Sequence, residues 1–494
     1  TLGNLTITAG TFSTADAGGN SKDLTVTGNT VVSGTLTGNN STLIFGTDGV
    51  HGSTEAGALH VESGGSLTFG SGDLTAFSGF TAKGTNTVTS TGGGDILIKG
   101  RTNNGFMNSH GHTGVNITGD YKIDFDTNAL HDIRGNMAIT AANITYLHGG
   151  RTYSFWTTAT TNTVTFTGNL NISGSSAELN TLASGQEAAD AFTVTGDAIL
   201  TGNLTANDTT ISLGSLRVDG TYSATSGTTI ITSERSNGRA IDIVGTYTHN
   251  GGTLEIRTPA DTDLRCPSSS SLNDLTINHA SCIARPTGDN KPPIGGGLTI
   301  TAGTFNTLDS DGGSSHDLTV TGGIRCIGGT FTGNASTVAI GFLEINAGGT
   351  FNAPNASGSL TINNKDTTTD NRAFDNDATF NHNSGTVTIT TASSTGLDLT
   401  GTGGTGINNL VINHASCTGN FEGAISLAGD LTITAGTFKA NTPASDTLTV
   451  DGNVSVTGIL GNANLAHDQN YSFGSLTIND GGTYNATSGT TTIT

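Results

Sequence analysis

The chain has 494 residues, of which 73 are glycine and 7 are proline, and only 12% are charged. Its formal net charge is −21, and no cluster of lysine and arginine offers a site for phosphates, so nucleic acid is not an expected partner. No stretch approaches the ~18 consecutive apolar residues of a membrane-spanning helix, so no membrane span is expected in this segment.

The eight-residue unit LTITAGTF occurs three times, at 5–12, 298–305 and 431–438. Large apolar residues alternate with threonine in this unit, which predicts a short strand with one buried face. The alanine–glycine pair then predicts a corner, because glycine allows the backbone angles of a tight turn. We expect the apolar residues of the three copies to form the structural core: Leu5, Ile7, Phe12, Leu298, Ile300, Phe305, Leu431, Ile433 and Phe438.

Looser copies of this unit recur along the whole chain, with steps of about 22 residues between Leu298 and Leu476. A repeat of this size is typical of a solenoid. The sequence therefore predicts an all-β chain that forms one continuous parallel β-solenoid over 1–494, with about 22 rungs. At ~4.8 Å per rung this would be an elongated rod on the order of 105 Å long. Neither end resembles a capping repeat, and we expect the chain to be a segment of a longer protein.

Residues 101–160 depart most from the pattern and are expected to be decorated, less regular rungs. They contain YKIDFD, in which Asp124 and Asp126 share one strand face with Lys122 beside them. Carboxylates two residues apart on a strand lie about 6.6 Å apart. Such a pair can perform acid–base chemistry on glycosides. The alternative is an ordinary solvated face with a local ion pair.

A longer repeat appears in the C-terminal half, because INHASC occurs at both 277–282 and 412–417 and LTITAGTF recurs there with an offset of 133 residues. This indicates a duplicated supermodule of about six rungs. Its copies place Cys282 and Cys417 roughly 29 Å apart, beyond disulfide reach. Cys266 and Cys282 could meet across adjacent corners, but we expect these cysteines and Cys326 to be small buried apolar residues.

Three further patterns raise the question of a ligand. His279 and His414 each lie near a cysteine, but such a pair supplies two ligands where structural zinc takes four, so no metal or cofactor is expected. The DSDG segment at 309–312 hints at a calcium loop, but Leu318 stands where the bidentate glutamate is needed, which favours a polar corner. Asn-x-Ser/Thr acceptors, such as those at Asn4 and Asn40, leave glycosylation possible.

The rungs LTITAGTF, LTVTGNTVVSGTLTG and STVAIGFLEINAGGTF resemble the repeats of large secreted prokaryotic surface proteins of the adhesin-like β-strand-repeat group. This resemblance covers essentially the whole chain. It implies a parallel β-solenoid shaft, an extracellular or cell-surface location and no active site. Further copies of the solenoid are the partners it implies, from the same chain or stacked head to tail.

The sequence leaves three functions open. The first is the structural shaft of an extracellular fibre, which is not an enzyme. The second is a β-helix that binds or cleaves polysaccharides, centred on 101–160, with surface glycans as partners. The third is ice binding by outward Thr-x-Thr pairs: Thr6/Thr8, Thr25/Thr27, Thr299/Thr301, Thr319/Thr321 and Thr432/Thr434.

Overall fold

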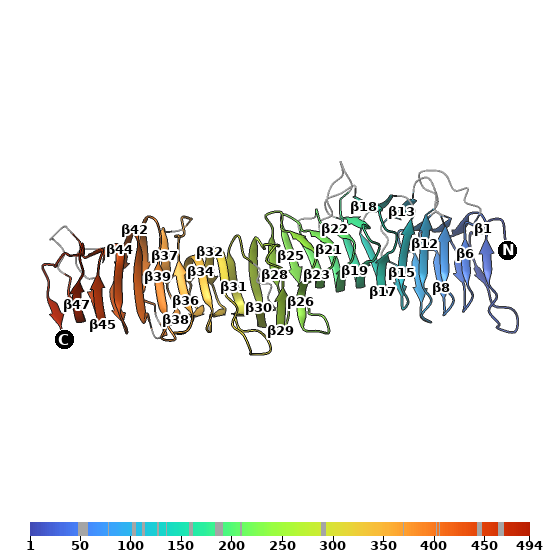
Figure 1. Cartoon of the computed structure of the whole chain (residues 1–494). Helices are drawn as coiled ribbons and strands as arrows, with labels where there is room; N and C mark the ends of the chain where they lie inside the picture. Colours follow the sequence, from blue (N-terminus) through green and yellow to red (C-terminus); the bar gives the residue numbers. More distant parts are fainter. Residues whose placement is uncertain are drawn as a thin grey trace. The chain divides into compact units, whose positions relative to one another are not determined.

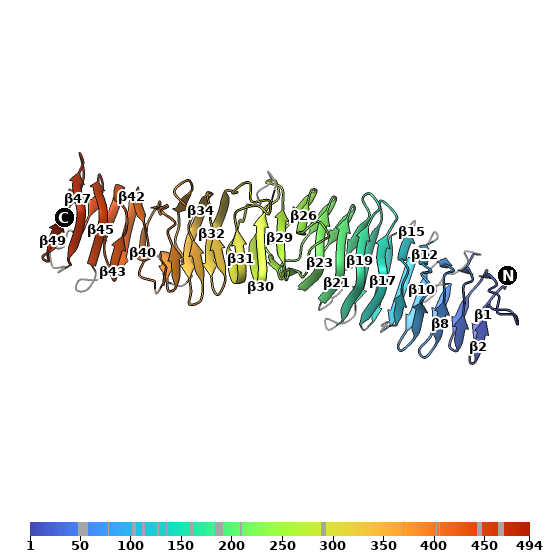
Figure 2. The same cartoon turned by 90° about the horizontal axis from the view of Figure 1, so that it is seen from below.

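The computed structural model describes residues 1–47, 58–77, 79–100, 105–110, 114–125, 128–134, 136–157, 162–182, 191–207, 210–287, 293–368, 370–401, 403–404, 406–441, 447–462 and 469–494. These residues form strands and no helix, so none of their segments is a helix that could span a membrane. They fall into two compact units, Thr1–Thr253 and Leu254–Thr494 (units 1 and 2). Figures 1 and 2 show strands following one another in chain order within each unit.

Unit 1 contains one sheet of eleven parallel strands: β1 (Leu5–Ile7), β4 (Thr30–Val32), β7 (Leu59–Val61), β10 (Phe80–Lys83), β13 (Gly105–His110), β16 (Ala129–Arg134), β18 (Thr152–Thr157), β20 (Glu178–Asn180), β22 (Asn203–Thr205), β24 (Thr221–Ser223) and β27 (Thr246–Thr248). Its other strands are β2 (Thr11–Ser13), β3 (Leu24–Val26), β5 (Thr35–Thr37), β6 (Leu43–Phe45), β8 (Ser66–Phe69), β9 (Leu74–Phe77), β11 (Thr87–Ser90), β12 (Ile96–Gly100), β14 (Val115–Ile117), β15 (Tyr121–Phe125), β17 (Met137–Tyr146), β19 (Thr163–Ile172), β21 (Ala191–Leu200), β23 (Thr210–Val218), β25 (Thr228–Ile231) and β26 (Arg239–Ile243).

Strand β28 (Thr253–Ile256) begins on the last residue of unit 1. The strands of unit 2 are β29 (Asp261–Arg265), β30 (Asp274–Pro286), β31 (Leu298–Asn306), β32 (Leu318–Cys326), β33 (Thr330–Thr332), β34 (Thr337–Ile345), β35 (Thr350–Asn352), β36 (Ser359–Ile362), β37 (Arg372–Asn376), β38 (Thr379–Asn381), β39 (Thr386–Ile389), β40 (Ser394–Asp398), β41 (Gly403–Gly404), β42 (Asn409–Glu422), β43 (Ala424–Leu427), β44 (Leu431–Ala440), β45 (Thr447–Val456), β46 (Ile459–Leu460), β47 (Tyr471–Ile478), β48 (Thr483–Tyr484) and β49 (Thr491–Ile493).

Each unit is a parallel β-solenoid, which confirms the predicted fold class. A strand pairs in parallel with the strand one turn further along the chain, so residues at the same register position form columns that run through successive turns. Two inward columns of unit 1 begin Leu24–Leu43–Leu74–Ile96–Tyr121 and Phe12–Leu36–Leu67–Val88–Val115. In β2, β5, β8 and β11 the residues that alternate with these apolar residues are threonine and serine, and they point outward.

The number of turns is about 18, and the predicted 22 is wrong. The count from the sequence takes Leu298 and Leu318 as successive rungs, but they lie in different columns, because Leu298 pairs with Ile324 and Leu318 with Val338. Steps along a column also vary, from the 18 residues between Ala198 and Leu216 to the 31 residues between Leu43 and Leu74. Insertions at the corners lengthen a turn without disturbing the strand register.

The register of unit 2 separates positions that look equivalent in the sequence. One inward column contains Leu298, Ile324, Leu343, Phe374, Leu397 and Phe421. A second contains Leu318, Val338, Leu360, Val387, Leu410, Leu431, Val454 and Leu476. The copies of LTITAGTF that begin at Leu298 and Leu431 therefore lie in different columns.

Eight of the nine predicted core residues are buried, each with an exposed fraction of 9% or less. Phe12 is only half-buried. The expected corner after LTIT is a bend within a longer strand in two of the copies, because β31 and β44 run through it. Gly303 has φ of 82° at this bend, and a Cβ there would lie 2.4 Å from the carbonyl oxygen of His279, so only glycine fits.

A third column of unit 2 consists of phenylalanines. Phe305, Phe331, Phe351 and Phe380 are paired in register, with successive ring centroids 6.0, 4.6 and 5.7 Å apart and nearly parallel planes. All four are almost completely buried. Each ring contacts the next ring along the stack, so these residues join four successive turns through the core.

Candidate functional site

The face predicted from YKIDFD is made by β15. Lys122 and Asp124 are half-buried on its outward side, whereas Asp126 lies outside the described residues. The Lys122 ammonium contacts Asp95 Oδ2 at 2.5 Å and Asp120 Oδ2 at 3.5 Å. Asp124 lies 3.3 Å from His148 Nδ1. Lys122 thus forms its ion pairs with acids at the preceding corners, a pairing that the local sequence does not show.

The corners contain side-chain links between turns that the sequence analysis missed. In unit 1, Asp73 Oδ1 accepts the Asp95 N–H at 3.0 Å, and Asp95 Oδ1 accepts the Asp120 N–H at 2.8 Å. In unit 2, Asn409 Oδ1 accepts the Asp430 N–H at 2.8 Å, and Asp430 Oδ1 accepts the Asn453 N–H at 2.7 Å. In the same way, a side-chain oxygen accepts a backbone N–H of the next turn at these other residues: Asn4, Asp23, Asn40, Asn136, Asn169, Asp274, Asp317 and Asn470.

We call these hydrogen bonds Asx corner links. Each one pairs a backbone N–H group at a corner, where the backbone hydrogen bonds between neighbouring strands are interrupted. Most of the linking residues directly precede the first apolar residue of a strand, as Asp95 precedes Ile96 and Asp430 precedes Leu431. An Asp or Asn before the LT[IV] pattern was therefore the available signal. An unpaired backbone N–H is costly when water is excluded, so the links stabilise the corners.

The most highly charged part of unit 2 is an outward column of one arginine and four acids, which we call the acid column. Successive register positions hold Arg325, Glu344, Asp375, Asp398 and Glu422. Like charges opposite each other on neighbouring strands repel, so four adjacent carboxylates destabilise the stack unless cations lie among them. Arg325 binds Glu344 from one end, with its Nε 2.7 Å from Glu344 Oε2.

Arg372 supplies the second cation of the acid column. Its guanidinium lies 2.6 Å from Asp375 and 2.7 Å from Glu422, and 3.8 Å from Asp398. The carboxylate of Asp370 also contacts this guanidinium, at 3.2 Å. One arginine therefore bridges carboxylates from three successive turns, and it holds the acid column together.

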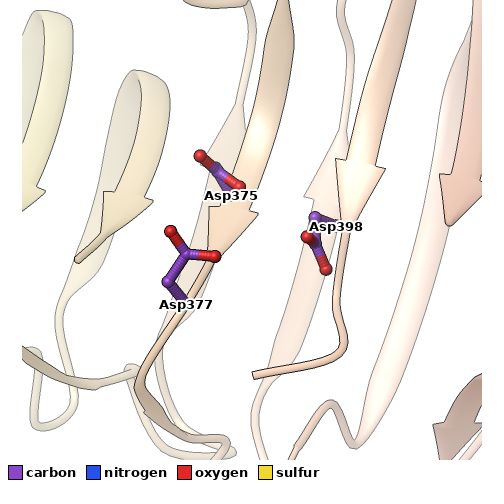
Figure 3. Close-up of side chains that lie close together, drawn as sticks. All are labelled: Asp375, Asp377 and Asp398. Carbon is purple, nitrogen blue, oxygen red and sulfur yellow. The ribbon is translucent and has the colours of Figure 1, made fainter. Parts of the chain in front are cut away.

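Asp375, Asp377 and Asp398 each bring one oxygen within 4.8 Å of the others, the single such grouping of three or more metal-ligating side chains found among the described residues. Figure 3 shows Asp375 and Asp398 on neighbouring strands and Asp377 just beyond the end of β37. Calcium takes about 6–8 oxygen ligands. Three carboxylates, two of which contact Arg372, could supply only part of such a shell.

Burial perturbs the ionisation of Asp375. The pKa of this carboxyl is raised to about 6, mainly by burial and to a smaller extent by the carboxylates of Asp370 and Asp377, against the opposing effect of Arg372. At mildly acidic pH Asp375 therefore takes up a proton, and the acid column loses one negative charge.

The remaining candidate ligand residues have structural partners. Nδ1 of His279 accepts the Ser281 N–H and Nδ1 of His414 accepts the Ser416 N–H, each at 3.2 Å, so both histidines stabilise their own turns. In the DSDG segment, Asp309 Oδ1 accepts the N–H groups of Gly313 and Ser314. The Asp309 loop is a polar corner closed by its own aspartate.

The four cysteines are free thiols with exposed fractions of 1% or less. Cys266 donates to the carbonyl oxygen of Ser270 at 3.3 Å, and Cys282 lies 3.4 Å from the Thr258 hydroxyl. Burial raises the pKa of Cys266 and Cys326 to about 12. They are packed as small interior residues, and Cys266 and Cys282 form no disulfide.

The predicted Thr-x-Thr pairs point outward but do not form a regular array. Thr6 pairs in register with Val31, Thr25 with Ile44 and Thr319 with Ala339, while Thr432 lies between Val411 and Ser455 and Thr299 between Thr276 and Arg325. A continuous hydroxyl column exists on other strands of unit 1, with one asparagine: Ser13, Thr37, Thr68, Thr89, Asn116, Thr140 and Thr167.

No family model, curated protein or solved structure matches the chain. Function must therefore be inferred from the columns, corners and charged clusters themselves.

Proposed function

We propose that this chain is a structural shaft segment of an extracellular or cell-surface fibre and performs no catalysis. The observation that carries this proposal is the continuity of the connections between turns. In each unit, parallel backbone pairing joins every described turn to the next, apolar columns run through the interior, and Asx corner links bind the turns at their edges. Such a stack can transmit tension from turn to turn.

The charged groups support a structural role. Lys122, Arg325 and Arg372 each bind carboxylates from other turns, with contacts of 2.5 to 2.7 Å. These pairs tie neighbouring turns together. The acidic net charge of −21 opposes lateral aggregation of such a shaft, and further copies of the solenoid are the partners we propose. Surface glycans remain a second class of partner.

Electron microscopy of the purified chain and of the native material tests this proposal. A shaft predicts a narrow rod that lengthens by ~4.8 Å per turn, and native fibres of the same width that an antibody against this chain labels along their length. A near-spherical particle, or label confined to the cell interior, would contradict it. Single-molecule pulling should unfold the rod in small successive steps, because each turn contacts only its neighbours.

Ice binding is a second candidate, because the hydroxyl column from Ser13 to Thr167 is regular and faces outward. A second hydroxyl column runs beside it through Thr11, Thr35, Ser66 and Thr87. Together they place hydroxyls at ~4.8 Å intervals between strands. Thermal hysteresis by the purified chain, abolished by T68K with T89K, is the expected result. A chain without thermal hysteresis would eliminate this candidate.

A further inference from the structure

A polar groove lies on the outward face of unit 2 where β45, β47 and β49 are adjacent. Figure 2 shows these three strands one after another. Its volume is about 360 Å³, within the range of about 300–1,000 Å³ that small-molecule pockets occupy. The residues that line it are Thr447, Thr449, Asn470, Tyr471, Ser472, Thr490 and Thr492. This groove is separate from the acid column, and it shares Asn470 with one of the Asx corner links.

Strand register arranges the polar groups of the groove along the stack. Thr449 pairs with Ser472, and Ser472 pairs with Thr492, so three hydroxyls follow one another in successive turns. Asn470 is exposed, and its Oδ1 accepts the Thr490 N–H at 2.9 Å. This bond occupies one lone pair of the amide oxygen and fixes which end of the amide faces the backbone, so the amide nitrogen is the donor that the side chain has left to offer.

The chemistry of the lining restricts the ligand. Among the residues that the structure describes, no lysine, arginine, aspartate or glutamate lines the groove, so this lining offers neither a counter-charge for an ionic ligand nor carboxylates for a metal. Tyr471 is almost completely buried, so its ring is not a stacking platform. What remains is a row of hydroxyl groups and an amide at ~4.8 Å intervals. Neutral oligosaccharides present hydroxyl groups repeatedly along their length and complement such a row.

We infer that this groove binds a neutral oligosaccharide, oriented along the stack across three turns. Hydrogen bonds to hydroxyls contribute modestly in water, and the groove lacks an aromatic platform. The affinity of one site is therefore low, with a dissociation constant on the order of 1 mM. Several copies of the chain held together would strengthen binding to a surface that displays many sugars, through multivalency.

The test uses the full chain on an array of immobilised neutral oligomers of glucose, mannose and N-acetylglucosamine, with sulfated and uronic acid oligomers beside them. The groove variant carries T449V, S472A and T492V, which remove three hydroxyls and keep the β-branched shape at two positions. We expect the wild-type chain to bind at least one neutral oligomer and the groove variant to bind it at least tenfold more weakly.

The matched control variant carries T304V, T330V and T350V. These three threonines also form an outward column in unit 2, beside the stacked phenylalanines and away from the groove. The control variant should bind like the wild-type chain. The single substitution S472I, which fills the middle of the groove without adding a ring or a hydroxyl, should also abolish binding, and it provides the test if the groove variant does not fold.

Three results would overturn the inference. They are no binding to any neutral oligomer above the background of an unrelated protein, preference for the acidic oligomers, and equal loss of binding in the groove and control variants. None of these results depends on whether the chain is a shaft, because electron microscopy tests that proposal separately.

Discussion

The ionisation of Asp375 is set by the acid column in which it lies. Its pKa in the folded chain is about 6, above the ordinary value of 3.8. Between these values the folded chain binds a proton that the unfolded chain does not. By linkage, the free energy of unfolding increases as pH falls through this interval, and the ionised Asp375 opposes folding above pH 6.

The substitution D375N tests this predicted direction of the pH dependence. It should flatten the pH dependence of the free energy of unfolding between pH 4 and 6, because the group that takes up the proton is removed. Urea unfolding followed at several pH values provides the measurement. D377N is the control, since it leaves Asp375 in place and only lowers its pKa by removing a neighbouring carboxylate. Identical pH profiles for wild type and D375N would contradict the assignment.

Asp95 is perturbed in the opposite direction. Burial opposes its ionisation, but the Lys122 ammonium and the Asp120 N–H outweigh burial and lower the pKa. A lowered pKa stabilises the folded chain above pH 3.8, and this contribution is lost as pH falls through the folded pKa. Asp95 thus belongs to both an ion pair and an Asx corner link.

Two substitutions separate these roles. D95N keeps an oxygen that can accept the Asp120 N–H but loses the ion pair, which is worth about 0.2–1 kcal/mol at a partly exposed site. D95A removes the acceptor as well, and should cost about a further 1 kcal/mol. Hydrogen exchange at Asp120 is the readout. Equal exchange rates in D95N and D95A would show that the link contributes nothing.

At the scale of strands, we expect substitutions in the phenylalanine column to reduce stability in proportion to the side-chain volume they remove. Phe351 lies between Phe331 and Phe380 and is completely buried. F351A should destabilise this part of unit 2 by about 3–5 kcal/mol, because it leaves a cavity and removes two ring contacts. F351L fills more of the same space and should cost clearly less. Chemical unfolding monitored by exchange in β33, β35 and β38 measures both. Similar losses for the two variants would contradict the expected grading, because they would assign the effect to the lost ring contacts rather than to the cavity.

The strands could be predicted from the sequence because their signal is local. Alternation in LTIT decides which residues face inward, and the burial of Leu298 and Ile300 follows from it. Register between turns is not local. Whether Leu298 lies beside Leu318 or Ile324 depends on the length of the corner between them, and Ile324 is the true neighbour.

For the same reason, the contacts within the candidate sites could not be predicted from the sequence. The acid column joins residues that are 19 to 31 positions apart, and no spacing in the sequence identifies them as neighbours. Likewise the partners of Lys122 became visible only when β12 and β15 were placed side by side. The Asp or Asn residues before several strands were visible in the sequence, but their role as acceptors requires knowledge of the next turn.

At the scale of the whole molecule, a solenoid should lose structure locally. I300D puts a charge into the core between Ile277 and Cys326, its register neighbours, and should destabilise these turns by about 3–5 kcal/mol. Hydrogen exchange should accelerate in β30, β31 and β32 and stay unchanged in β45 and β47, because each turn contacts only its neighbours. T301D, at an exposed position on the same strand, is the control. Loss of protection throughout unit 2 would contradict this expectation.

The four buried thiols give the chain a set of native reporters. A thiol reagent attacks the thiolate, which burial suppresses, so a cysteine should react only while its own turn is open. Cys266, Cys282, Cys326 and Cys417 lie in different strands or corners of unit 2. Their labelling rates under load or in mild denaturant would thus record which turns open first, without any engineered probe. A fibre built from this chain would retain a chemical record of where it had been strained.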